Sequence, residues 1–240
     1  MYANMTLLKA KNNMGFAIDI MYEYTTAFLE RKVHEMPMLE IGAGYGLYSL
    51  KAIEFGHEII CNDLIDEHID QIKENVPGHL LNKINFFIGS FPEEVSIKHN
   101  SVSAILIARV LHLLKIEHLE NAIKSMHDIL VPDGKMYVTV ETLYLPNWTR
   151  YLPEFERKLQ CGDKWPGYII DINKYEASGI AELFPETIHL FTKEILSDVF
   201  QNAGFTIEKC SCICRKGIFP EEYVGESRES VGVIAVKNDI

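Results

Sequence analysis

The chain has 240 residues, of which 48% are hydrophobic and 24% charged, so it is long enough to bury a sizeable core without disulfide or metal staples. Its 23 Lys and Arg residues against 34 Asp and Glu residues give a formal net charge of -11. This balance argues against nucleic acid as the main partner, because a phosphate backbone is bound by basic surfaces. We expect a single domain over residues 1–240.

Secretion and membrane insertion are not predicted. The first residues show no basic stretch followed by an apolar one. The longest apolar stretch, 104–114, contains Arg109 and His112 and is too short to cross a bilayer. Five cysteines, an odd number, suit a reducing compartment. We predict a cytoplasmic protein without membrane contact.

Short apolar runs alternate with amphipathic segments from residue 38 onward. Runs of the kind that form buried strands cover 38–41, 58–61, 84–88, 101–108, 136–140, 205–215 and 230–237. Apolar residues at helical spacing cover 47–54, 66–76, 116–130 and 192–202. Gly56, Pro132 and Gly204 follow three of these helices and are typical helix stops.

Strands separated by helices at this spacing predict right-handed βαβ units, and therefore an α/β fold with a doubly wound, mostly parallel sheet of seven strands. The link between 205–215 and 230–237 is too short for a crossover helix. These last two strands are therefore expected to pair as an antiparallel C-terminal hairpin.

Two segments fall outside the strand–helix alternation. Residues 1–35 are expected to form an N-terminal helical cap, with a helix over 14–29 that carries Tyr22 and Tyr24. Residues 143–190 contain both tryptophans and several prolines, and they form an insertion after the fifth strand. A segment of that length inside a compact domain is usually a lid or a binding loop.

A glycine-rich turn lies between the first of the alternating strands and its helix. Residues 40–46 read Glu-Ile-Gly-Ala-Gly-Tyr-Gly, and such glycines let the backbone approach a ligand closely. Asp63 ends the next strand, where a carboxylate can accept both hydroxyls of a ribose. Position 47, where a dinucleotide fingerprint has its third glycine, is Leu47, which argues against an NAD-type oxidoreductase.

An acidic residue two positions before G-x-G-x-G resembles the first motif of the class I S-adenosylmethionine-dependent methyltransferases. The resemblance extends over 36–142 and 190–238, through further segments in the family's order. These segments are Gly-Ser-Phe at 89–91, Ala-Arg-Val-Leu-His-Leu-Leu at 108–114, Leu-Val-Pro-Asp-Gly at 130–134 and the Ala-Gly-Phe that ends 192–205. The resemblance implies a Rossmann-like methyltransferase fold, S-adenosylmethionine as cofactor, and methyl transfer as the activity.

The resemblance also implies roles for residues at the matching positions. The turn and Glu40 would face the methionine end of the cofactor, and the two residues after the fourth strand would come close to the same end. Asp63 would hold the ribose, Leu64 would pack on the adenine, and two residues after the third strand would lie at the adenine's edge. The implied cofactor-binding residues are Glu40, Gly42, Gly44, Gly46, Asp63, Leu64, Ser90, Phe91, Ala108 and Arg109.

Two residues after the fourth strand admit two interpretations each. Arg109 holds a carboxylate of cofactor or substrate through its planar guanidinium, or it pairs with a neighbouring acid on the surface. His112 is either a general base or a packing residue beneath the site. Methyl transfer to a suitable nucleophile needs mainly an in-line approach, so no catalytic residue is assigned.

Three cysteines alternate along the predicted strand 205–215. Cys210, Cys212 and Cys214 would share one face of that strand. They lack the C-x-x-C spacing or paired histidines of a four-ligand site, so we expect buried small apolar residues and no metal.

The acceptor is expected to meet the N-terminal helix and the insertion, as the family resemblance implies. The insertion's aromatic residues suit an apolar or planar small molecule, or they anchor the insertion to the core. Ala108-Arg-Val-Leu replaces the Asn/Asp-Pro-Pro-Tyr pattern of nucleic-acid amino-methyltransferases. The leading hypothesis is therefore transfer to a small-molecule acceptor, with protein methylation open. The alternative is a non-catalytic cofactor-binding partner or regulatory module. If the chain self-associates, a homodimer is expected.

Overall fold

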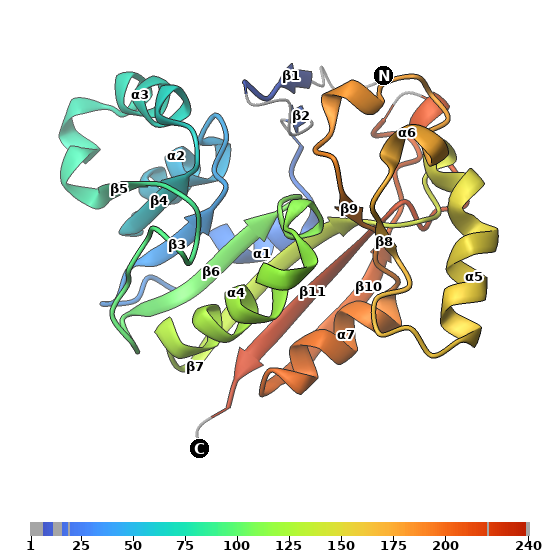
Figure 1. Cartoon of the computed structure of the whole chain (residues 1–240). Coiled ribbons are helices and arrows are strands. Elements are labelled where there is room, and N and C mark those ends of the chain that lie inside the picture. Colours follow the sequence, from blue (N-terminus) through green and yellow to red (C-terminus); the bar gives the residue numbers. More distant parts are fainter. Residues whose placement is uncertain (1–6, 12–15, 19, 220, 239–240) are drawn as a thin grey trace.

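The computed structural model describes residues 7–11, 16–18, 20–219 and 221–238 (Figure 1). Its centre is a seven-stranded sheet in the order β10-β11-β7-β6-β3-β4-β5. These strands are β3 (Met38–Ile41), β4 (Ile59–Asp63), β5 (Ile84–Ile88), β6 (Val102–Ala108), β7 (Leu130–Glu141), β10 (Phe205–Ile213) and β11 (Ser230–Lys237).

Strand directions in the sheet follow the prediction. The strands from β7 to β5 pair in parallel, whereas β11 runs antiparallel to both β7 and β10. The doubly wound α/β fold with an antiparallel C-terminal hairpin is thus confirmed. Because the parallel strands end at one edge, the segments that follow β3, β4, β5 and β6 lie next to one another there.

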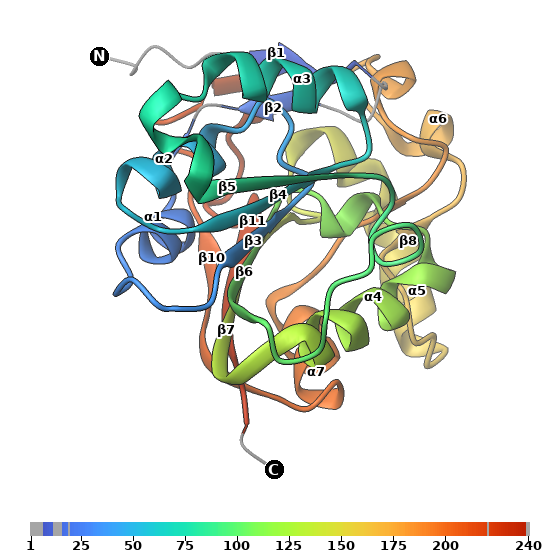
Figure 2. The same cartoon turned by 90° about the vertical axis from the view of Figure 1, so that its left-hand side faces the viewer.

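Helices cover both faces of the sheet (Figure 2). The helices are α1 (Glu23–Leu29), α2 (Leu47–Glu54), α3 (Asp66–Asn75), α4 (Ile116–Ile129) and α7 (Lys193–Asn202). Successive strand residues alternate between the faces, so Leu39 packs in the core with α4 and α7, and its neighbour Met38 packs in the core with α1, α2 and α3. This two-sided burial explains why the strands are continuous apolar runs.

Strand β7 is longer than predicted. The sequence suggested 136–140, with a turn at Pro132 ending the preceding helix, but the strand begins at Leu130. Its pairing with β6 shifts between Leu130 and Lys135, and Asp133 has a φ of 59°. The turn residues therefore form a bulge within the strand, which accommodates a proline that has no N–H for the ladder.

The N-terminal helix is shorter than predicted. Within the described residues, β1 (Leu7–Lys9) and β2 (Phe16–Ile18) pair antiparallel, and the helix begins only at Glu23. Met14, where the helix was expected to begin, lies outside the described residues. The helix start is marked by the Thr25 hydroxyl, which accepts the backbone N–H of Tyr22 at 2.9 Å.

The insertion has a hydrophobic cluster of its own. It contains α5 (Leu152–Gln160), β8 (Tyr168–Ile169), α6 (Ile172–Tyr175) and β9 (Ile188–His189), and β8 pairs antiparallel with β9. Trp148 and Tyr151 are each 1% exposed inside this cluster. Their role is therefore anchoring, which was one of the two interpretations of the insertion's aromatic residues.

The expected burial of three cysteines is wrong for two of them. Cys210 is partly buried, but Cys212 and Cys214 are exposed. The Cys210 thiol lies 3.6 Å from the carbonyl oxygen of Lys193, the first residue of α7, so this helix does not extend over Cys212. No group of three His, Cys, Asp or Glu side chains in the described part could hold a metal. None of the described helices is both long and apolar enough to cross a membrane.

Gly232 offers a test of the contact between α1 and the sheet. A Cβ at this position would lie 2.3 Å from ring atoms of Tyr24, whose side chain is buried and whose hydroxyl is hydrogen-bonded to Ser211. We expect Gly232→Ala to lower the free energy of unfolding by about 1–3 kcal/mol, as overpacking does. Urea unfolding of this variant measures the loss. Gly78→Ala, at a position open to solvent, is the control and should leave stability nearly unchanged. Equal stability of the two variants would contradict the packing described.

Candidate active site

The turn after β3 requires glycine at two positions. Gly42 and Gly46 have φ angles of 70° and 78°, which side chains rarely adopt. A Cβ at Gly42 would lie 2.5 Å from a methyl of Val110, and one at Gly46 would lie 2.6 Å from Ile72. The loop therefore passes close to residues that follow β6 and to α3, with backbone alone at the contact points.

Asp63 joins the glycine loop to the end of β4. Its Oδ2 accepts the backbone N–H of Gly44 at 2.7 Å, and its Oδ1 accepts that of Ile65 at 2.9 Å. His68 Nδ1 lies 3.1 Å from the same Oδ1. A carboxylate has about four lone-pair positions, so Asp63 retains acceptor capacity while it holds the loop.

Glu40 is buried beneath the loop. It is 2% exposed, and the Ser49 hydroxyl donates a hydrogen bond to its carboxyl group. Burial raises the pKa of Glu40 to about 8, because the charged form loses its hydration. The nearby Asp63 adds to this increase, while the Ser49 hydrogen bonds oppose it.

Two exposed apolar side chains lie beside Asp63. Leu64 is 48% exposed, and Ile88, which pairs with Asp63 across β4 and β5, is 49% exposed. Ile88 was not singled out from the sequence, where it is only the last residue of an apolar run. Two exposed apolar side chains therefore lie at the carboxyl ends of β4 and β5, beside Asp63 in the chain and in the sheet, respectively.

The residues after β5 have local partners. The Ser90 N–H donates to Glu94 Oε2 at 2.8 Å, and its hydroxyl donates to Glu93 Oε2 at 3.2 Å. The Phe91 side chain is 6% exposed and packs in the core on the α4 face. Ser90 and Phe91 thus lie at the same edge as Asp63, with only Ser90 near solvent.

Arg109 directly follows Ala108, the last residue of β6, and is held in place by backbone and side chain. Its φ is 61°, and its N–H donates to the carbonyl of Thr139 at 2.7 Å. Its guanidinium forms an ion pair with Glu141, whose side chain is 6% exposed. The acid that Arg109 pairs with is therefore a buried residue, not the surface acid suggested by the sequence.

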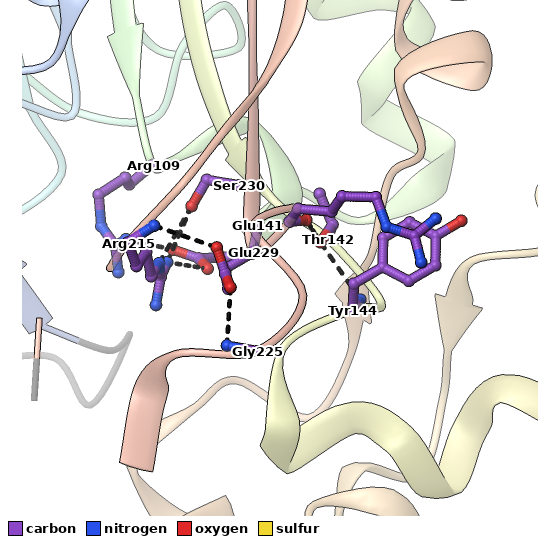
Figure 3. Close-up of polar contacts among 9 residues, drawn as sticks. Arg109, Glu141, Thr142, Tyr144, Arg215, Gly225, Glu229 and Ser230 are labelled. Carbon is purple, nitrogen blue, oxygen red and sulfur yellow. Dashed lines mark hydrogen bonds and ion pairs between the residues drawn. The ribbon is translucent and has the colours of Figure 1, made fainter. Parts of the chain in front are cut away.

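Glu141 is shared between two arginines (Figure 3). Arg109 pairs with its Oε1, and Arg215, from the segment between β10 and β11, pairs with its Oε2. Arg215 also donates from NH2 to the Ser230 hydroxyl at 2.9 Å. Burial would raise the pKa of Glu141, but the two guanidinium groups outweigh it and hold the pKa below its usual value.

Neither Glu141 nor Arg215 was predicted from the sequence as a site residue. The only sequence signal for Glu141 is its charge at the end of an apolar strand, and Arg215 has none, because its partner lies 74 positions away. The two residues became recognisable only as a buried ion pair.

His112 lies in the short 3-10 helix Leu111–Leu113 and is 3% exposed. Burial lowers its pKa to about 3, and the charges of Arg109 and Arg215 act in the same direction, against that of Glu141. An imidazole that weakly basic is a poor proton acceptor at neutral pH. Of the two interpretations, the packing role fits this environment better.

Together these residues form one edge of an open parallel sheet, with a glycine loop, a carboxylate and an apolar surface at neighbouring strand ends. This arrangement is typical of α/β proteins that bind a nucleoside-containing ligand at the carboxyl ends of parallel strands. Residues 38–134 match the sequence model of a family described as a methyltransferase domain. No curated protein matches the chain.

Solved structures of methyltransferases share the fold. An S-adenosylmethionine-dependent methyltransferase from Methanosarcina mazei is 20% identical, with a TM-score of 0.64 over 91% of this chain and 98% of that one. A second, from Mesorhizobium loti, is 16% identical, with a TM-score of 0.61 over 89% and 95%. The 1,6-didemethyltoxoflavin-N1-methyltransferase of Burkholderia thailandensis, solved with 1,6-didemethyltoxoflavin and S-adenosylhomocysteine, is 17% identical, with a TM-score of 0.62 over 90% and 78%.

Residues 38–134, which carry the glycine loop and Asp63, are therefore similar to a methyltransferase domain. This match indicates a methyltransferase enzyme.

The protonation of Glu40 gives a pH-dependent prediction. Because its pKa is raised to about 8 in the folded state, Glu40 contributes stability that is complete below its ordinary pKa and is lost as the pH rises toward 8. Glu40→Gln cannot ionise, so the melting temperature of wild type minus that of the variant should fall between pH 5 and pH 8 and level off above pH 8. The slope in free energy is at most about 1.4 kcal/mol per pH unit.

Thermal unfolding at several pH values measures this difference. Glu58→Gln, at an exposed glutamate that precedes β4, serves as the control and should run parallel to wild type. A Glu40→Gln curve that also stayed parallel would show that Glu40 is ionised throughout.

Proposed function

We propose that the protein transfers a methyl group from S-adenosylmethionine to a small-molecule acceptor by an in-line displacement. The observation that supports this most is the juxtaposition of the glycine loop, Asp63 and the exposed Leu64 at one sheet edge. Such an edge offers backbone groups, a carboxylate and an apolar surface to a nucleoside with a charged tail.

The ribose and adenine of the cofactor would use separate parts of this edge. Asp63 would accept a ribose hydroxyl with its remaining lone pair on Oδ2, and the adenine would lie on the exposed side chains of Leu64 and Ile88. Ser90 would meet the adenine's edge, and Phe91 would contribute through its backbone, since its side chain packs in the core.

The methionine end of the cofactor would lie between the glycine loop and the end of β6. Gly42, Gly44 and Gly46 bring backbone close to this position, and Ala108 and Arg109 border it from the neighbouring strand. Glu40 lies below the loop, where the positive charge of the cofactor would favour its ionised form.

A small molecule is the acceptor class that the chain favours. The net charge of -11 disfavours nucleic acid, and the structurally similar enzyme from Burkholderia thailandensis was solved with a small acceptor. Since the pKa of His112 is lowered to about 3, positioning of the acceptor would supply most of the rate. Protein methylation is the competing acceptor class.

The single-domain organisation, the homodimer and the cytoplasmic location stay predictions.

The cofactor site is tested by titrating the protein with S-adenosylhomocysteine, with NAD as control, by calorimetry and by the shift in melting temperature. A ligand that binds only the folded state raises its stability in proportion to ln(1 + [L]/Kd). We expect binding of S-adenosylhomocysteine and none of NAD. Leu64→Arg should weaken binding at least tenfold without loss of stability, because Leu64 is 48% exposed.

Leu81→Arg is the matched control, since Leu81 is 54% exposed. It lies in the 3-10 helix Gly78–Lys83, which precedes β5, whereas the site lies where the parallel strands end. Equal weakening in both variants would contradict the placement of the adenine. Binding without turnover on any small molecule or cell extract would favour a non-catalytic cofactor-binding module.

A further inference from the structure

Several buried polar atoms beside the end of β6 have no hydrogen-bond partner among the described residues. They include the Tyr22 hydroxyl, Arg109 Nε and His112 Nδ1. Tyr22 and His112 are only 5% and 3% exposed. A buried polar atom without a partner is costly, so a group of them at a candidate site indicates that a ligand supplies the missing partners.

The unpartnered atoms lie around one charged centre. The charges of Arg109, Arg215 and Glu141 all act on the Tyr22 hydroxyl and on the His112 ring. Tyr22 comes from the segment before α1, and His112 from the 3-10 helix after β6. Residues from two distant parts of the chain thus flank the guanidinium of Arg109.

Arg215 has its partners within the fold. It pairs with Glu141, donates to the Ser230 hydroxyl, and stacks over the ring of Phe219 with 4.4 Å between guanidinium carbon and ring centroid. The nearby Glu229 is satisfied by backbone, because its carboxylate accepts the N–H groups of residues 215, 225 and 227. Glu229 therefore does not neutralise the second guanidinium by direct contact.

Arg109 has hydrogen-bonding capacity and positive charge that Glu141 does not fully match. It shares the single carboxylate of Glu141 with Arg215, so two positive charges face one negative charge. Its side chain is 20% exposed, against 4% for that of Arg215, and its Nε has no hydrogen-bond partner among the described residues. The fork of a guanidinium is matched best by the two oxygens of a carboxylate.

We propose that Tyr22, Arg109 and His112 form the acceptor subsite and that it takes a small molecule bearing a carboxylate group. This rests on the proposed function. Arg109 and the Tyr22 hydroxyl hold the carboxylate, and the neutral His112 offers a polar contact to the body of the acceptor. The insertion borders this subsite through His189, which lies near His112 and is stacked on Phe191 at 4.1 Å between ring centroids.

A second source of the same chemistry is the carboxylate of the cofactor's own methionine end. The two sources predict that replacement of Arg109 weakens the binding of different ligands. If Arg109 holds the acceptor, its replacement weakens acceptor binding far more than it weakens binding of S-adenosylhomocysteine. If it holds the cofactor, the loss is in affinity for S-adenosylhomocysteine.

The experiment uses protein saturated with S-adenosylhomocysteine and titrates it with benzoate, phenylacetate and 3-phenylpropionate. Each carboxylate is compared with its uncharged primary amide, which has nearly the same shape. We expect at least one carboxylate to bind and its amide to bind at least tenfold more weakly. Arg109→Gln should remove this preference, while Glu141 keeps its pairing with Arg215. Arg157→Gln, at an exposed arginine on α5 that pairs with Glu154, should change nothing.

Tyr22→Phe separates a ligand contact from a structural role. The hydroxyl lies beside the Arg109 guanidinium without a well-aligned hydrogen bond, so its removal should change the melting temperature little. The proposal expects carboxylate affinity to fall several-fold in this stable variant. Unchanged affinity in Tyr22→Phe, equal binding of acids and amides, or binding of none of the acids would overturn it. Failure of wild type to bind S-adenosylhomocysteine would instead overturn the proposed function on which it rests.

Discussion

The ion pairs of Glu141 connect three parts of the sheet that the chain does not connect directly. Glu141 ends β7, Arg109 follows β6, and Arg215 comes from the link between β10 and β11. A buried carboxylate is tolerated only when its charge is compensated, so the position of each arginine is constrained by the other. The edge of the sheet where the strands end is therefore a defined arrangement of charges as well as of loops.

The glycine loop adds a second constraint at the same edge. Its N–H at Gly44 is taken by Asp63, and its close contacts with Val110 and Ile72 leave no room for side chains. Backbone groups are thereby presented to a ligand without flexible atoms in the way. The cofactor side of the site is satisfied largely within the fold, whereas the Arg109 side retains unpartnered polar atoms. For this reason our proposal assigns the buried polar atoms to the acceptor and not to the cofactor.

Local patterns carried the prediction of most elements. The strand 84–88 and the helix 47–54 were predicted with the bounds observed, because apolar runs and glycine stops act over a few residues. The strand 136–140 was too short, since a proline–glycine turn and a bulge have the same local signature and only pairing with β6 distinguishes them. Cys212 was placed wrongly for a similar reason, because the reach of α7 over β10 depends on packing.

The sequence by itself determined the order of strands and helices, the glycine loop and the position of Asp63, because each depends on residues close together in the chain. Only the tertiary structure decided which charges meet. Arg215 and Glu141 are 74 positions apart, and Tyr22 and Arg109 come from opposite sides of the glycine loop in the sequence. Ion pairs across such separations leave no periodic signal, since a single contact between two strand ends requires only one residue of each. The family can thus be recognised from local motifs, while the acceptor site depends on how the strand ends are brought together.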